Sequence, residues 1–184
     1  MIRISHTPDE ILKFWFEEIE PKAWFAKDLA IDQEIKVRFG DLLSQAINGE
    51  LYHWRTSPQG RLAEIIVLDQ FSRNIHRDTP QAFAADPMAL ALAQEAVAAG
   101  VDKQLQPKQI PFLYMPYMHS ESRAIHEVAL ILFNREGAEN NLVFEQQHKA
   151  IIDQFGRYPH RNAILGRQST DEELAFLAKP GSSF

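Results

Sequence analysis

The chain contains 184 residues, of which 45% are hydrophobic and 24% are charged, with no cysteine and a formal net charge of -6. This composition is typical of a soluble globular protein, the acidic balance disfavours nucleic acid and anionic membranes as partners, and the lack of cysteine excludes disulfides and thiolate chemistry. Charged residues interrupt the apolar positions of residues 1–18, and no apolar run approaches the ~20 residues of a membrane helix. We therefore expect no signal peptide, no membrane span and a cytoplasmic protein.

Helix-start and helix-stop signals recur along the N-terminal part of the chain. Residues 7–10 read TPDE, a capping box with proline at the first helical position, and Pro21 ends the helix that follows. A second helix is predicted from Asp28 to the Asn-Gly stop at residues 48–49. A third begins at the Ser-Pro pair of residues 57–58 and runs into Asp69.

The middle of the chain carries the same kinds of signal. Thr-Pro at residues 79–80 and Asp-Pro at residues 86–87 each predict a cap followed by a first-turn proline, and Gly100 ends the alanine-rich helix of residues 88–99. Ser120 or a residue near it starts a long helix that Gly137 stops.

The C-terminal part contains two further predicted helices. One starts at Asn140 or Asn141 and carries apolar residues as far as Phe155; a shorter one starts at the capping box of residues 170–173 and ends before residues 180–181. The chain is therefore predicted to be a single all-α domain, residues 1–184, with about seven to eight helices in stacked antiparallel hairpins.

A short phrase occurs twice, each time where a predicted apolar helix gives way to a loop. Residues 69–74 read DQFSRN and residues 153–157 read DQFGR. Acid, amide and arginine groups near a core are usually joined in a hydrogen-bond network or used on a ligand. Asp69 and Arg73, four residues apart, are expected to pair on one helix face. The alternative is a surface ion pair worth under ~1 kcal/mol.

His119 follows an apolar, aromatic stretch and precedes a predicted helix start. Helix N-termini favour anions and lower the pKa of nearby imidazoles. His119 is thus a candidate neutral base or ligand-binding donor, with Glu121 as its partner. In the alternative interpretation, Ser120 and Glu121 only cap the helix and His119 is a hydrogen-bonded core histidine.

The histidines offer little support for a metal site. Glu145 and His148 are three residues apart, which matches half of a ferritin-like carboxylate site, but no second such pair is present. No zinc-binding spacing joins any of the histidines at positions 119, 126, 148 and 160. No P-loop, nucleophile elbow, dinucleotide fingerprint or EF-hand loop is present either. We predict neither a metal nor a cofactor.

Residues 155–170 form a local basic island in this acidic chain. They include Arg157, His160, Arg161 and Arg167 and no acidic residue. Arginine forks bind carboxylates and phosphates through two hydrogen bonds, so an anion site is one interpretation. The other is that these arginines cap helix ends and pair with the chain's own carboxylates.

Five phrases together resemble a bacterial family known as domain of unknown function 924: residues 14–16 (FWF), 68–74 (LDQFSRN), 112–121 (FLYMPYMHSE), 155–162 (FGRYPHRN) and 165–170 (LGRQST). The resemblance covers nearly the whole chain and implies an all-α, tetratricopeptide-like fold, without implying an activity. His126 stands where the family pattern has glutamine, which speaks against a required ligand role. The resemblance implies that the family's signature positions include the candidate residues Asp69, Gln70, Arg73, Asn74, His119, Glu121, His148, Arg157, His160, Arg161, Asn162 and Arg167.

Three functions are compatible with this pattern. The leading hypothesis is a pocket for a small phosphate- or carboxylate-bearing ligand or an acidic chain end. Arginines 73, 157, 161 and 167 would clamp the anion, Asn74 and Asn162 would add hydrogen bonds, and histidines 119, 148 and 160 would tune the pocket.

In the second hypothesis the same pocket is a hydrolase or transferase site. His119 or Glu121 would act as general base, and Asp69 would orient one of the catalytic groups. In the third, the protein is a peptide-binding scaffold whose groove is lined by Trp15, Phe16, Trp24, Phe25 and Trp54. Core packing is the alternative for those aromatic residues.

Overall fold

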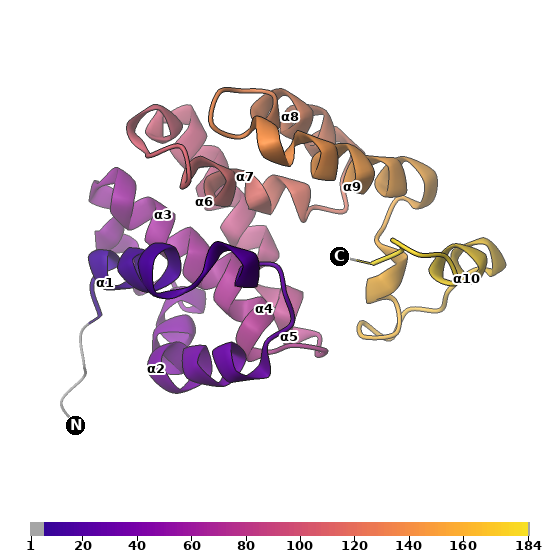
Figure 1. Ribbon diagram of the computed structural model, residues 1–184, viewed down its shortest axis with the longest axis horizontal. Coiled ribbons are helices and arrows are strands. Elements are labelled where there is room, and N and C mark those ends of the chain that lie inside the picture. Colours follow the sequence, from indigo (N-terminus) through magenta and orange to yellow (C-terminus); the bar gives the residue numbers. More distant parts are fainter. Residues whose placement is uncertain (1–5, 184) are drawn as a thin grey trace.

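The computed structural model describes residues 6–183, which are mostly helical and contain no β-strand (Figure 1). The all-α prediction is confirmed. Two of the ten α-helical segments, α4 and α5, have only four residues each, and the other eight agree with the expected seven to eight helices. The segments are α1 (Pro8–Lys13), α2 (Leu29–Ile47), α3 (Pro58–Ile66), α4 (Ser72–Ile75), α5 (Gln81–Ala84), α6 (Asp86–Ala98), α7 (Ile110–Met118), α8 (Arg123–Phe133), α9 (Leu142–Phe155) and α10 (Asp171–Leu177).

The predicted side-chain caps are present at the starts of α1, α2, α3 and α10, whereas α5, α6, α8 and α9 begin without one. The Thr7 hydroxyl accepts a hydrogen bond from the Glu10 amide, and the Asp28 carboxylate accepts from the first amides of α2. Thr170 and Glu173 form the complete reciprocal box at the start of α10. These caps satisfy amides that have no partner within the helix, and they set where each helix begins.

Helix α7 and the π-helical turn that follows α3 were not predicted. Residues 110–118 form α7, in which every residue is buried although Pro116 lies inside the helix. A helix that is apolar on all sides shows no helical periodicity in its sequence and is buried on all sides in the fold. In addition, residues 67–71 form a π-helical turn (Val67–Phe71) that continues α3 into α4. The first copy of the repeated phrase, residues 69–74, therefore forms the last turns of this continuous helix, which ends at Ile75 as the chain enters a turn.

The main hydrophobic core extends from α1 to α8. Helix α7 packs against α3, α6 and α8, and α9 packs against α8. In Figure 1, α1–α4 occupy one side of the body and α7–α9 another, while α10 stands apart at the C-terminal end. A second, small cluster of Ile151, Ile152 and Tyr158 packs against Phe155 and Phe176. The C-terminal segment (residues 156–183) thus adds little apolar contact to the body.

The tetratricopeptide-like stacking and the single-domain organisation stay predictions. No helix within residues 6–183 is long and apolar enough to cross a membrane. Three of the five aromatic residues considered for a groove, Trp15, Phe16 and Trp54, are buried in the main core. Only Trp24 and Phe25 remain at the surface.

Candidate functional site: a polar network beneath the C-terminal segment

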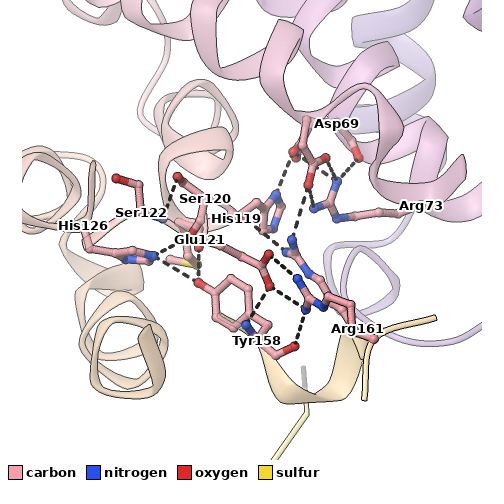
Figure 2. A network of polar contacts seen from close by, with 12 residues as sticks. Asp69, Arg73, His119, Ser120, Glu121, Ser122, His126, Tyr158 and Arg161 are labelled. Atoms are coloured by element: carbon pink, nitrogen blue, oxygen red, sulfur yellow. Dashed lines mark hydrogen bonds and ion pairs between the residues drawn. The ribbon is translucent and has the colours of Figure 1, made fainter. Parts of the chain in front are cut away.

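Asp69 and His119 form the centre of a buried polar network (Figure 2). Asp69 lies in the π-helical turn after α3, and His119 directly follows α7. The His119 Nδ1 is 2.7 Å from the Asp69 Oδ1, and the Gln70 side-chain amide donates to the other carboxylate oxygen at 2.6 Å. The Asp69 side chain is only 1% exposed and that of His119 is 15% exposed. The imidazole therefore has limited access to solvent.

Arg73 connects this pair to α6. Its guanidinium donates to the Asp69 main-chain carbonyl at 2.9 Å and to the Asp69 Oδ1 at 3.3 Å, so the pairing expected from the four-residue spacing is present. Two shorter bonds, of 2.7 and 2.9 Å, join it to the Asp86 carboxylate. Asp86 was predicted only as a helix cap; it is the first residue of α6, and its carboxylate faces Arg73.

Arg161 reaches the network from the C-terminal segment. Its guanidinium donates to the His119 carbonyl oxygen at 3.1 Å and lies 3.6 Å from an Asp86 oxygen. It packs between the rings of Phe83 and Tyr158, at 4.5 and 4.6 Å from their centroids. The residue is 6% exposed, and its buried Nε has no hydrogen-bond partner among residues 6–183.

The charges of this network determine the state of His119. Burial acts to raise the pKa of Asp69, but its interaction and hydrogen bond with His119, together with the charge of Arg73, outweigh it and hold that pKa at about 2. Burial, and then the Arg73 charge, lower the pKa of His119. Asp69 is therefore an anion at neutral pH and His119 is neutral. Because an ionised carboxylate only accepts hydrogen bonds, the proton of His119 sits on Nδ1 and Nε2 carries a lone pair.

The comparisons with known proteins agree with these motifs. The sequence profile of a family described as "Bacterial protein of unknown function (DUF924)" matches residues 11–181. The chain belongs to this family. It is also similar to a solved structure, a protein of unknown function, ATU0120, from Agrobacterium tumefaciens, with 36% identity and a TM-score of 0.88. That match covers 93% of this chain and 96% of the other, whereas no curated protein matches.

In this DUF924 chain, Glu121 and Arg167 form a second group beside the network. Arg167 donates to both Glu121 carboxylate oxygens, at 2.7 and 2.9 Å, and to the Asn162 side-chain oxygen at 2.9 Å. The Tyr158 amide also donates to Glu121, at 2.7 Å. Burial acts to raise the pKa of Glu121, but these hydrogen bonds outweigh it and the pKa is lowered. Glu121 is thus an ionised anchor for the C-terminal segment.

Arg157 and Asn162 stabilise the C-terminal segment from within. Arg157 donates to both oxygens of Glu173, at 2.7 and 2.8 Å, and to the Gln168 carbonyl oxygen at 2.8 Å. Asn162 donates to Glu173 and to Ser169. The hydrogen bond from Arg157 is the largest influence on Glu173 and, with the others, lowers its pKa to about 2. A role in the capping box could be predicted for Glu173, but its partnership with Arg157 could not.

The two copies of the repeated phrase do not converge in space. Asn74, in the first copy, donates to Asp32 at 2.8 Å beside Arg77, which forms its own hydrogen bonds to the same carboxylate. Asp153, in the second copy, is exposed and pairs with Lys149 at 2.7 Å. The structure therefore places Asn74 outside the network.

Three further histidines surround Tyr158. Ring centroids of His126, His148 and His160 lie 6.3, 5.7 and 5.6 Å from that of Tyr158. Burial is the main cause that lowers the pKa of His148 to about 3 and that of His160 to about 4. Among residues 6–183, no three His, Asp or Glu side chains are placed to hold a metal ion.

The sequence offered no reason to assign a role to His126, but His126 forms a wholly buried pair with Glu145. Its Nδ1 lies 2.6 Å from a Glu145 oxygen, and its Nε2 lies 2.8 Å from the Ser120 carbonyl oxygen. Both side chains are 0% exposed. The spacing of Glu145 and His148 drew attention to Glu145, but no local signal linked it to a residue in α8.

Proposed function

We propose that the chain binds a small anionic ligand, carrying a phosphate or carboxylate group, between Arg161 and His119. The observation that carries the proposal is the state of Arg161. Within residues 6–183, its buried guanidinium has no carboxylate oxygen closer than 3.6 Å. Arg73, Arg157 and Arg167, in contrast, each have one at 2.7 Å.

A buried charge is costly unless it is paired and fully hydrogen-bonded. Burial, followed by the charge of Arg73, lowers the pKa of Arg161, so its charged form is incompletely compensated. An anion contacting the unpartnered Nε would supply the missing acceptor. The rings of Phe83 and Tyr158 hold the guanidinium in place for that contact.

Proton uptake would help the site to accept an anion. Around the site, the positive charges of Arg73, Arg161 and Arg167 are matched by three carboxylates, and His119 is neutral. An added anion is therefore best balanced when His119 gains a proton. In this proposal the ligand contacts Arg161, His119 and Arg73, and histidines 148 and 160 lie on the Tyr158 side. The C-terminal segment is positioned by Arg157, Arg167, Glu121 and Asn162.

The experiment is a thermal-unfolding and calorimetric titration with inorganic phosphate and with small mono- and dicarboxylates. Ligand at one hundred times its dissociation constant stabilises the folded state by ~2.7 kcal/mol. Arg161→Gln should lose this stabilisation, while Arg38→Gln, which removes a surface arginine paired with Glu18 and Glu34, should keep it. Equal stabilisation of wild type and Arg161→Gln would contradict the site, and no stabilisation by any anion would contradict the function.

The Asp69–His119 pair favours a second candidate function, a hydrolase or transferase at the same site. A buried carboxylate that orients one imidazole nitrogen leaves the other as a general base. His119 fits that role better than Glu121, because Arg167 and the Tyr158 amide occupy both Glu121 oxygens. A phosphatase and esterase screen of wild type and His119→Ala tests this candidate. Turnover that is the same in both would exclude His119 from catalysis.

A further inference from the structure

A surface cavity of about 460 Å³ lies away from the polar network. Three segments line it: the Trp24–Phe25 pair, residues 107–112 at the start of α7, and the turn of residues 136–141 before α9. We propose that this cavity binds a small organic cation, an ammonium group on an apolar body. Its volume falls within the range of ligand pockets, ~300–1,000 Å³, and the proposal is independent of the anion site because the two share no residue.

One wall of the cavity is aromatic. Phe112 is its base, with the Trp24 ring perpendicular to it at 5.0 Å and the Phe25 ring nearly parallel to it at 6.0 Å between centroids. The Trp24 indole N–H donates to the Trp15 carbonyl oxygen at 2.8 Å, which holds this ring in place. Phe25 is 64% exposed. Aromatic faces attract cations, and an exposed phenylalanine gains by covering its apolar surface.

Another part of the lining is acidic. Glu136 and Glu139 line the cavity, and neither forms an ion pair or side-chain hydrogen bond with another residue of the described range 6–183. Gly137, between them, has φ +88°, and a Cβ there would lie 2.9 Å from the Ile110 Cδ1. Glycine thus lets this turn approach the start of α7 closely enough to form the wall.

The balance of charge selects a cation. Lys108 also lines the cavity, but its ammonium group lies 5.7 Å from the Phe16 ring centroid. Two carboxylates against one ammonium leave the lining negative. An ammonium group that contacts the glutamates while its apolar body covers Phe25 satisfies both walls, whereas an anionic ligand satisfies only the aromatic one.

The test compares three probes that share one phenyl ring and differ in the charge of the head group: 2-phenylethylammonium, 2-phenylethanol and phenylacetate. Binding is followed by ¹H–¹⁵N NMR through the Trp24 indole N–H, assigned by Trp24→Phe, with the buried Trp54 indole as internal reference. The ammonium should bind about three- to tenfold more tightly than the alcohol, as expected for contacts with exposed carboxylates. Phenylacetate should bind most weakly.

Two variants test the acidic and the aromatic parts of the lining separately. In Glu136→Gln/Glu139→Gln the ammonium should lose its advantage while the alcohol binds as before, and Phe25→Ala should weaken all three probes. Glu95→Gln, at an exposed glutamate of α6 outside the cavity, should change nothing. Failure of all three probes to shift the Trp24 signal at millimolar concentration would overturn the cavity as a site. Equal binding of ammonium and phenylacetate, or an unchanged preference in the double variant, would overturn the cation assignment.

Discussion

The Nδ1 of His119 lies 2.7 Å from the Oδ1 of Asp69, fifty residues earlier in the chain, and both belong to a network that Arg161 closes from the C-terminal segment. One contact therefore joins the turn after α3 to the end of α7. Because Asp69 also accepts from Gln70 and Arg73, its carboxylate is both an anchor of the fold and the group that sets the proton position on His119.

Asp69→Asn should destabilise the protein strongly. The substitution leaves Arg73 with one fewer buried counter-charge and presents His119 with a group that both donates and accepts. Removing one partner of a buried ion pair costs ~3–5 kcal/mol. Asp153→Asn, in the exposed second copy of the phrase, is the matched control and should cost at most about 0.5 kcal/mol. Urea unfolding measures both, and equal costs would show that the buried network does not stabilise the fold.

His148 should make the protein less stable in acid. Burial is the main cause that lowers its folded-state pKa to about 3, from an ordinary value of 6.5. As the pH falls from 6.5 towards 3, the unfolded chain therefore takes up a proton that the folded protein excludes, and the free energy of unfolding decreases.

His148→Gln should make this decrease shallower, with His160 still contributing, because its pKa is lowered to about 4. His53→Gln, at an exposed position, should leave the slope unchanged. The measurement is the free energy of unfolding in urea at a series of pH values between 7 and 4.5. If the free energy of unfolding changed with pH equally in wild type and His148→Gln, His148 would not be the origin of the acid sensitivity.

Tyr158→Phe should loosen the C-terminal segment. The Tyr158 hydroxyl donates to the Met118 carbonyl oxygen at 2.5 Å and lies 3.2 Å from the His126 Nε2. Without the hydroxyl, the buried Met118 carbonyl oxygen loses this hydrogen bond, which lowers the free energy of unfolding by ~1–3 kcal/mol. Hydrogen exchange of residues 156–183 should accelerate, whereas Tyr117→Phe, at another buried tyrosine, should have little effect there. Unchanged protection in Tyr158→Phe would mean that other contacts hold the segment.

The two phenylalanines of the cavity should respond differently to truncation. Phe112 is 2% exposed, so Phe112→Ala leaves a void in the core and should cost ~3–5 kcal/mol. Phe25 is 64% exposed, and Phe25→Ala should cost well under that amount, about 1 kcal/mol or less. Thermal unfolding compares them. A large cost at Phe25 would indicate that its ring is a structural element and that the binding variant needs a milder substitution.

Several helix ends were predictable because their causes are local, whereas α8 ends at Phe133 and not at Gly137 as predicted. Thr7, Asp28 and Thr170 cap amides within three residues of themselves, and Gly156 ends α9 with a positive φ of 71°. Helix α7 escaped prediction since its residues are apolar on every side and two prolines interrupt the expected pattern.

The sequence by itself determined the fold class, the family and the set of polar residues with unusual surroundings. Only the tertiary structure decided which partners they meet: Arg73 meets Asp86, Arg167 meets Glu121, Arg157 meets Glu173, and Asn74 meets Asp32. It alone separates Arg161, whose Nε has no hydrogen-bond partner in the part of the chain that the structure describes, from the other arginines of the basic island. The physical reason is that caps and periodicity act between neighbours in the chain, whereas ion pairing depends on packing that brings distant segments within 3 Å.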